Sequence, residues 1–380
     1  MPPAEPRLDH GVVIVGAGPV GLLLGCLLAQ GGVDVALCEQ RDGDDVRSRA
    51  IGIHPPGLAM LDRAGAGAAV RAEALALAGG EVLSRGRVLA SLAFPADRPV
   101  LVLPQRRTHA LLSQRLDRLS PGALRAGCSV SGVRDEGGFV RVRLDAEGRR
   151  RELTAAFAVI ADGVHSGLRT GLGLGWRRRA GSARYAMADV ADPDVGATAL
   201  LHCGPGGLVE SFPLPGGVRR WVVRAAEDED IGTAAGFRAA IRVRTGADPA
   251  IGSDVVPVAF TARQHVARAP ARGRIALLGD AAHEISPIGG QGMNLGWADA
   301  GRLDAALRAA LADGRADLGD YGRRTLRAAR GAQRRSAFYM AMGAPARHGL
   351  PLLARELLIR SLGSAPLRPW AAGLVTMRGL

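Results

Sequence analysis

The sequence predicts a mixed α/β fold with a parallel α/β unit, a separate antiparallel sheet and C-terminal helices. Short apolar runs that lead into glycine-rich turns and apolar helical stretches occur at residues 12–38 and again at 275–311. Between them, residues 184–265 carry alternating runs separated by Gly and Pro turns, as in antiparallel sheets. Helical periodicity returns at 321–342 and 352–362.

The first element is a strand, a glycine-rich turn and a helix. Val12 to Val15 is an apolar run, Gly16-Ala17-Gly18-Pro19-Val20-Gly21 follows, and an apolar helical stretch continues through Leu28. Gly16 allows a tight turn, Gly18 lets the backbone meet a pyrophosphate, and Gly21 permits close packing of the helix on the strand. This spacing predicts a dinucleotide-binding turn.

A second apolar run, Val33 to Cys38, ends in Glu39. An acid at this distance from the glycines is suited to accept hydrogen bonds from a ribose 2′-OH, and it disfavours a 2′-phosphate. The dinucleotide is therefore expected to be FAD or NAD. A solvated strand end is the alternative interpretation of Glu39 alone.

Residues 106–119 have helical periodicity, and residues 128–160 are predicted to form a three-stranded meander, with strands at 130–133, 140–144 and 153–160. The last strand of the meander ends in Asp162-Gly163, and Arg169 follows. Asp-Gly is a common turn pair, so its position between the other glycine-rich segments is what favours a ligand role.

The antiparallel region is expected to hold four strands, a helix and a last strand. Their predicted ranges are 185–190, 198–202, 208–213, 218–224, 237–244 (the helix) and 256–264.

The most informative stretch is residues 274–300. A buried strand from Ile275 to Leu278 leads into the turn Gly279-Asp280, a loop with Pro287 and glycines 289 and 290, and a helix from Gln291 to Leu311. The glycines allow close backbone approach, and the helix N-terminus presents unpaired N–H groups of partial positive charge. This suits the N1–C2=O edge of a reduced flavin, with Asp280 facing sugar or ribityl hydroxyls. An ordinary strand–loop–helix junction is the alternative.

With these motifs in this order, the chain resembles the single-component, FAD-dependent (class A) aromatic hydroxylases of the para-hydroxybenzoate hydroxylase and ubiquinone-biosynthesis monooxygenase superfamily. The resemblance spans nearly the whole chain. Two departures are Ile160, where the family usually has Gly, and Pro56-Gly57-Leu58-Ala59, where Arg-Thr-Leu-Glu is frequent. No C-terminal thioredoxin-like extension is expected, unlike in the longer polyketide and phenol hydroxylases of the group.

The resemblance implies a Rossmann-like, glutathione-reductase-type FAD-binding domain with non-covalent FAD. It implies cofactor contacts from Gly16, Gly18, Pro19, Gly21, Glu39, Arg49, Gln105, Asp162, Gly163, Gly279, Asp280, Pro287, Gly290, Gln291, Gly292, Met293 and Asn294. The expected domain ranges are 1–175 (FAD-binding, first part), 176–268 (substrate sheet), 269–320 (FAD-binding, return) and 321–380 (C-terminal helices).

The implied activity is NAD(P)H- and O₂-dependent hydroxylation of a phenolic, quinone or polyketide-type aromatic compound through a flavin C4a-hydroperoxide. Pro287 resembles the family proline beside the reacting edge, with its carbonyl toward substrate; a loop-rigidifying role is the alternative. No catalytic base is assigned, and His54, His202, His265 and His283 are candidates only.

Other reactions on the same scaffold stay open: epoxidation, oxidative rearrangement, drug inactivation or reduction of an isoprenoid double bond. Halogenation is disfavoured, because the sequence has neither a Trp-x-Trp-x-Ile-Pro pattern nor any lysine. No feature supports a non-enzymatic flavin-binding role. The sequence leaves the substrate, NADH versus NADPH and the oligomeric state open.

Composition fits an enzyme that binds small molecules. With 380 residues and 47% hydrophobic content, the chain can bury a large core. The net charge of +13 comes from arginines scattered along a chain with 4% aromatic residues, so nucleic-acid binding is not expected. The four cysteines lack metal-ligand spacing, so no metal site is expected. The first ten residues, MPPAEPRLDH, lack the apolar core of a signal peptide, and no apolar run is long enough to span a membrane. A cytoplasmic location is expected.

Overall fold

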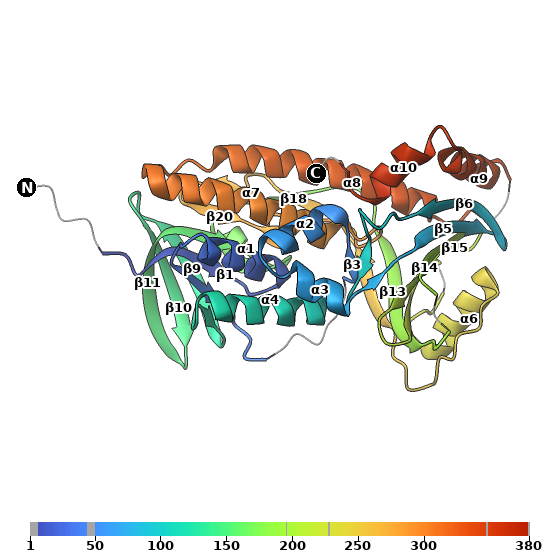
Figure 1. The fold of residues 1–380 in the computed structure, drawn as a ribbon, viewed down its shortest axis with the longest axis horizontal. Helices are drawn as coiled ribbons and strands as arrows, with labels where there is room; N and C mark the ends of the chain where they lie inside the picture. Colours follow the sequence, from blue (N-terminus) through green and yellow to red (C-terminus); the bar gives the residue numbers. More distant parts are fainter. Residues whose placement is uncertain (1–6, 44–49, 195, 227–228, 347–348, 379–380) are drawn as a thin grey trace, which may run out of the picture.

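The computed structural model describes residues 7–43, 50–194, 196–226, 229–346 and 349–378. Figure 1 shows two sheets at opposite ends of the molecule, with the long helices α7 (Gln291–Asp313) and α8 (Gly319–Met342) running along one side of it. The predicted mixed α/β class, with a parallel sheet and C-terminal helices, is confirmed.

The first sheet has the strand order β19-β20-β11-β1-β2-β8, in which β19 pairs with β20 in antiparallel fashion. These strands are β19 (Ala271–Arg272), β20 (Ile275–Leu277), β11 (Arg149–Ile160), β1 (His10–Val15), β2 (Val35–Cys38) and β8 (Leu124–Arg125). From β20 to β8 every neighbouring pair is parallel. The carboxyl ends of these strands therefore lie along one edge, where α/β sheets bind ligands.

Alternation along β1 sends side chains to two cores. Val12 and Ile14 pack against α1 (Pro19–Gln30), α4 (Gln105–Leu119) and α7. Val13 and Val15 face the other way and pack against the meander that β9 (Cys128–Asp135) and β10 (Val140–Ala146) form with β11. The sheet is buried on both faces, which explains its continuous apolar runs.

The second sheet has the order β17-β13-β16-β15-β14-β5-β6. Its strands are β17 (Val258–Ala262), β13 (Ala183–Ala191), β16 (Val218–Arg224), β15 (Gly207–Leu214), β14 (Thr198–Gly204), β5 (Gly79–Ser84) and β6 (Arg87–Ala93). The five predicted strands of this region are confirmed within a few residues. β5 and β6 fall within residues 1–175, which were expected to form the first part of the FAD-binding domain. β5 pairs with β14 in parallel, however, so β5 and β6 extend the second sheet. The chain thus visits the second sheet before it completes the first.

The second sheet also has two distinct faces. Val209 and Val223 lie in one apolar cluster with residues of α6 (Ala234–Thr245). We call the opposite face the inner face; there Leu208 and Val222 share a cluster with Ile288, with side chains of α8 and with α9 (Leu350–Gly363). The inner face is therefore directed at the loop that precedes α7.

The remaining elements are short or connect the sheets. They are α2 (Pro55–Arg63), α3 (Gly67–Glu73), α5 (Gly167–Gly171), α10 (Arg368–Val375), the 3-10 turn η1 (Gly279–Ala281), and the strands β3 (Gly52–Ile53), β4 (Leu75–Ala76), β7 (Leu101–Val102), β12 (Trp176–Arg178), β18 (His265–Ala267) and β21 (His283–Glu284). Within the described ranges, no helix combines the length and the apolar character needed to cross a membrane.

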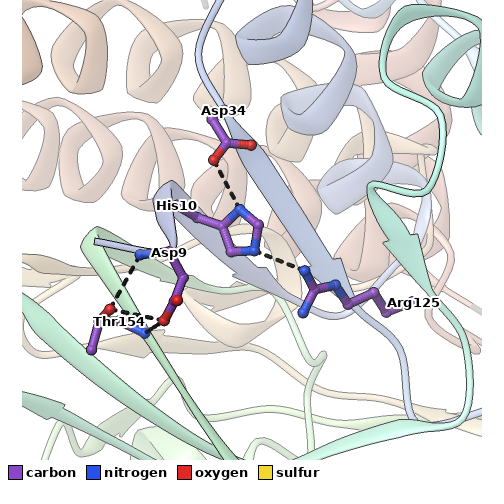
Figure 2. Close-up of polar contacts among 5 residues, drawn as sticks. All are labelled: Asp9, His10, Asp34, Arg125 and Thr154. Atoms are coloured by element: carbon purple, nitrogen blue, oxygen red, sulfur yellow. Dashed lines mark hydrogen bonds and ion pairs between the residues drawn. The ribbon is translucent and has the colours of Figure 1, made fainter. Parts of the chain in front are cut away.

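A polar cluster fastens the amino end of β1 to its neighbours (Figure 2). Arg125 donates to Nε2 of His10 at 2.8 Å, so the other ring nitrogen, Nδ1, donates to Asp34 at 3.0 Å. Beside it, Asp9 accepts hydrogen bonds from the backbone N–H and the hydroxyl of Thr154, which hold the pKa of Asp9 below its usual value. Asp9, His10 and Asp34 lie at the amino ends of β1 and β2, away from the glycine-rich turns, and we assign the cluster a structural role.

Candidate functional site

Each predicted glycine or acidic motif follows the carboxyl end of a parallel strand. The motifs are Gly16–Gly21 after β1, Glu39 after β2, Asp162-Gly163 after β11 and Gly279-Asp280 after β20. Since β2, β1, β11 and β20 are direct neighbours in the sheet, segments far apart in the sequence form one continuous edge. This is the candidate site.

The three glycines of the first turn have different surroundings. Gly16 has a φ of +104°, and a Cβ there would lie 2.4 Å from the carbonyl oxygen of Ala161. A Cβ on Gly21 would lie 2.1 Å from the carbonyl oxygen of Gly16. A Cβ on Gly18 would meet nothing within 4 Å. Gly16 and Gly21 are therefore required by the fold, whereas Gly18 borders open space, as a pyrophosphate cradle requires.

Glu39 is tied to the glycine-rich turn. Its carboxylate accepts a hydrogen bond from the backbone N–H of Ala17 at 3.0 Å and others from Arg41. Burial opposes its ionisation, but these hydrogen bonds outweigh burial and hold the pKa of Glu39 below its usual value. Glu39 is thus an anion beside the turn, in the place predicted for a ribose contact.

Helix α4 also reaches this turn. Gln105 is its first residue, and its side-chain oxygen accepts from the backbone N–H of Ala50 at 3.2 Å. One helical turn on, Nε2 of His109 lies 3.0 Å from the carbonyl oxygen of Ala17. His109 was not identified from the sequence, because nothing local distinguishes it on an amphipathic helix. Arg49 lies outside the described residues.

Arg169 connects the Asp162-Gly163 turn with η1. Its guanidinium donates to the carbonyl oxygens of Ala281 and Val164 at 3.3 and 3.1 Å, and it stacks 3.7 Å from the ring centroid of Trp176. Asp162 is exposed at the strand end, and Gly163 has a φ of +88° with open space around a built Cβ.

The Gly279-Asp280 turn packs on the start of helix α1. Gly279 has a φ of +61°, and a Cβ there would lie 3.3 Å from Val20. Gly296 of α7 approaches the same valine, so α1, η1 and α7 converge around it. Asp280 is exposed on this turn. Pro19, at the start of α1, accepts a hydrogen bond from Nε1 of Trp297 at 3.1 Å.

The loop from Pro287 to Gly290 closes as a turn. The carbonyl of Pro287, which the resemblance places toward substrate, accepts a hydrogen bond from the backbone N–H of Gly290 at 2.9 Å. The Pro287 side chain is exposed. Gly289 and Gly290 have φ values of +86° and +64°, so residues other than glycine would be strained there. Helix α7 then begins at Gln291, with Gly292 and Met293 in its first turn. Backbone N–H groups of a first helical turn have no partner within the helix and are suited to bind an anion or a carbonyl oxygen.

Asn294 holds this loop to the segment before α2. Its side-chain oxygen accepts from the backbone N–H of His54 at 2.9 Å. Its side-chain nitrogen donates to the carbonyl oxygens of Gly52 and Gly290 at 3.0 and 2.9 Å. All three hydrogen bonds of the amide are made to backbone, so Asn294 fixes the position of both segments.

Several buried polar atoms around this loop have no hydrogen-bond partner among the described residues. They are Nδ1 of His54, Nε2 of Gln291, NH2 of Arg335 and the hydroxyls of Tyr185 and Tyr339. Burial lowers the pKa of His54 to about 4, so its ring is neutral at physiological pH. Buried polar atoms usually have partners, so this cluster indicates a place where a ligand completes the hydrogen bonding.

The other candidate histidines are partnered or face elsewhere. His283 is buried with Nε2 2.7 Å from a carboxylate oxygen of Asp299, and His265 lies 2.5 Å from Glu284. His202 pairs across the sheet with Val209 and so shares the α6 face, away from the inner face. The structure brings only His54 of the four to the glycine-rich loop.

Comparison with known proteins defines the family. Residues 9–336 match the family model described as an FAD binding domain. The chain is 33% identical over 311 residues to the 6-methylpretetramide 4-monooxygenase of Streptomyces rimosus, covering 77% of this chain and 54% of that protein. It is 30% identical over 324 residues to the 3-(3-hydroxy-phenyl)propionate/3-hydroxycinnamic acid hydroxylase of Comamonas testosteroni, covering 82% and 55%. The chain spans little more than half the length of these relatives.

Solved structures agree with the fold. The p-nitrophenol 4-monooxygenase of Pseudomonas putida DLL-E4 superposes with a TM-score of 0.85 at 23% identity, covering 97% of this chain and 98% of that one. The anhydrotetracycline hydroxylase of Streptomyces rimosus superposes with a TM-score of 0.80 at 28% identity, covering 98% and 76%. The chain belongs to the FAD-dependent class A aromatic hydroxylase family, and its cofactor is FAD.

Proposed function

We propose that this chain is an NAD(P)H- and O₂-dependent flavoprotein monooxygenase that hydroxylates a phenolic, quinone or polyketide-type aromatic compound. The observation that carries the proposal is the alignment of all the described cofactor motifs along one edge of the parallel sheet, with the inner face of the second sheet directed at the glycine-rich loop. The first feature is suited to bind FAD, and the second to cover an apolar ring.

In this proposal the dinucleotide lies along the carboxyl edge. The turn at Gly18 and the N-terminus of α1 face the pyrophosphate, because a Cβ on Gly18 would occupy open space. Glu39 accepts hydrogen bonds from a ribose, and Asp280 from ribityl or ribose hydroxyls. Asp162-Gly163 lines the same edge between them.

The flavin ring would lie at the N-terminus of α7. Free N–H groups of the first helical turn, with the helix dipole, are suited to stabilise negative charge at the N1–C2=O edge of the reduced ring. When bound and reduced by NAD(P)H, FAD supplies activated oxygen from O₂ for transfer to an aromatic carbon. Apolar side chains of the inner face and Ile288 would exclude water from this reaction.

The substrate class rests on the relatives and on the character of the inner face. Relatives of this chain are named as hydroxylases of tetracycline-type polyketides and of hydroxyphenylpropionates. The inner face offers leucine, valine, methionine and tyrosine side chains, which pack well against fused or single aromatic rings. A cytoplasmic location belongs to the same proposal, because NAD(P)H is an intracellular reductant.

The test is NAD(P)H oxidation by purified, FAD-loaded protein with a panel of phenols, naphthols, quinones and anthracycline- or tetracycline-type aromatic compounds. We expect one or more compounds to stimulate oxidation, with consumption of O₂ and a mass gain of one oxygen in the product. Loss of a substrate double bond without O₂ consumption would identify a reductase instead. A yellow protein whose NAD(P)H oxidation no compound stimulates would contradict the proposal.

A further inference from the structure

Glu210 lies at the centre of the inner face. It belongs to β15, the middle strand of the second sheet, and it pairs with Leu201 of β14 and Val222 of β16. Cross-strand partners share a face, and Val222 belongs to the cluster that contains Ile288. The Glu210 side chain is therefore directed toward the glycine-rich loop and α8, although only 4% of the residue is exposed.

Glu210 occupies the boundary between two apolar clusters. Leu208 and Val222 on one side pack with Ile288 and residues of α8. Leu201 and Phe212 on the other side pack in the cluster that contains Ile51. An acidic side chain surrounded in this way disrupts what would otherwise be one continuous apolar surface.

Among the described residues, no hydrogen bond and no charged partner contributes to the pKa of the Glu210 carboxyl, and burial alone shifts it. Buried acids elsewhere in this protein are paired: Asp299 accepts from His283, and Glu356 accepts from Ser84. Burial raises the pKa of Glu210 to about 8. Burying a carboxyl without a partner costs free energy, and proteins retain such groups mainly where they act.

The titratable and charged groups around it come from every element packed on this face. Within the sheet these are Tyr185, Cys203, Asp189, Arg220 and Arg224; from α8 and α9 they are Tyr339, Arg335 and Arg355. The cations are engaged: Arg220 pairs with Asp189, Arg224 donates to the Met340 carbonyl, and Arg355 donates to the Cys203 carbonyl. The hydroxyl of Tyr185, by contrast, has no partner among the described residues.

We propose that Glu210 is a catalytic residue of the proposed hydroxylation: its carboxyl contacts the phenolic hydroxyl of the substrate and takes up its proton. The inference rests on the proposed function and names the group that activates the substrate. The O–H bond of the phenol breaks, the proton bonds to a carboxylate oxygen of Glu210, and the electron pair stays on the phenolate oxygen. The phenolate ring is more electron-rich, so it attacks an electrophilic oxygen more readily. No further oxidant or reductant is required for this step.

The pH dependence of the hydroxylation rate follows from the raised pKa of Glu210. Glu210 is mainly protonated at pH 7 and becomes a carboxylate as the pH rises through about 8. The rate of hydroxylation in the wild-type holoenzyme is therefore expected to rise across this range. A base with a pKa near the working pH is also better matched to a phenol than an ordinary carboxylate.

The decisive experiment compares Glu210→Gln with wild type on ring-substituted phenols of decreasing pKa, chosen from compounds that the wild type hydroxylates. With the least acidic phenol, we expect the single-turnover hydroxylation rate to fall roughly 100-fold or more, as is usual for loss of a general base. The penalty should shrink as the phenol becomes more acidic, because an ionised substrate needs no base. FAD affinity should be unchanged. Glu81→Gln is the matched control, since Glu81 lies in the same sheet and pairs with Leu200, on the face that bears Ser211 and His202.

Each outcome has one meaning. A penalty that is equal for all phenols, or no penalty, overturns this inference while the proposed function stands. Absence of any stimulated oxidation by the yellow wild type overturns both. If Glu210→Gln does not fold, the test uses Glu210→Asp together with the pH dependence of the wild-type hydroxylation rate. A wild-type rate that does not change between pH 6.5 and 9.5 overturns the inference. So does a Glu210→Asp enzyme with the full rate and the same pH dependence as wild type.

Discussion

The cofactor edge of the first sheet and the inner face of the second sheet are built in opposite ways. At the cofactor edge, backbone geometry dominates: Gly16, Gly163 and Gly279 all have positive φ, and the acids follow the carboxyl ends of strands. On the inner face, the backbone is regular and the side chains differ from strand to strand. There, the carboxyl-bearing Glu210 is buried, and the hydroxyl of Tyr185 has no hydrogen-bond partner among the described residues.

This difference separates the common part of the chemistry from the specific part. A dinucleotide is recognised mainly by N–H groups and close backbone approach, which many sequences achieve with the same few glycines. A substrate is recognised by side chains on a rigid sheet, where each position can be exchanged without changing the fold. We therefore expect substitutions at the two regions to separate cofactor binding from substrate activation.

The largest effect is expected for Gly18→Val. Its backbone (φ −63°, ψ 170°) is accessible to valine, and a Cβ there meets no protein atom within 4 Å. The protein should therefore fold, yet the side chain would occupy the space proposed for the pyrophosphate. We expect a colourless protein with near wild-type circular dichroism and no measurable FAD binding by fluorescence titration.

Gly138→Val is the matched control, because a Cβ on Gly138 also meets nothing within 4 Å. It should remain yellow. A Gly18→Val protein that binds FAD with wild-type affinity would show that the cofactor edge is misassigned.

The cofactor edge could be predicted from the sequence because its requirements are local. A strand, a turn with glycines at fixed spacing and a helix are contiguous, and the acid at Glu39 follows at a fixed distance. The structure places the strand, the turn and the helix at the predicted positions. Helices elsewhere also agree: α4 starts at Gln105 and α8 at Gly319, one or two residues from their predicted starts. The ligand roles of the individual residues stay predictions.

The next effect concerns Asn294, which joins the glycine-rich loop to the segment before α2. Asn294→Ala would leave the backbone N–H of His54 and the carbonyls of Gly52 and Gly290 without their partner. We expect the free energy of unfolding to fall by about 2–4 kcal/mol, since each buried unpaired group costs ~1–3 kcal/mol and water recovers part of it. Chemical denaturation of the apoprotein measures it.

Asn294→Asp sharpens this test. It retains the acceptor for His54 but loses both donors to Gly52 and Gly290. Equal stability of wild type and both variants would mean that the loop is held by something other than this amide.

The inner face could not be predicted from the sequence, because its neighbours are set by sheet register. The run Gly79–Ala93 reads as two strands only when β5 is known to pair with β14. The stretch Leu208-Val209-Glu210 looks like any alternating strand, and the sequence does not reveal that Val222 and Leu201 flank the acid. His202 was a candidate for the same reason, and register places it on the other face.

A smaller effect is expected for Asp280→Ala at the cofactor edge. Asp280 is exposed on the turn after β20, and circular dichroism and denaturant unfolding of the variant report its effect on the fold separately from FAD binding. Removing an acceptor for FAD hydroxyls costs ~1–3 kcal/mol, so the FAD dissociation constant should rise roughly 5- to 150-fold. Asp97→Ala, another exposed aspartate, should leave FAD affinity unchanged. Wild-type affinity in Asp280→Ala would contradict its assignment to the cofactor.

The smallest effect tests His54, which lies where the two regions meet. Its folded pKa of about 4 is below the value near 6.5 of an unfolded chain, so the folded state disfavours the charged ring. The neutral ring of His54 therefore contributes its full free energy to folding above about pH 6.5, and this contribution is lost as the pH falls toward 4. Between pH 7 and 5.5 the loss should be roughly 1 kcal/mol.

His54→Gln isolates this contribution, because glutamine does not titrate. Denaturant unfolding of the apoprotein at both pH values should give a difference about 1 kcal/mol smaller in the variant than in wild type. His165→Gln, which changes an exposed histidine, should behave as wild type. Identical pH dependence of wild type and His54→Gln would mean that His54 is solvated in the apoprotein. The glycine-rich loop would then be open to water without a ligand, and the unpartnered Nδ1 of His54 would carry no information about a bound ring.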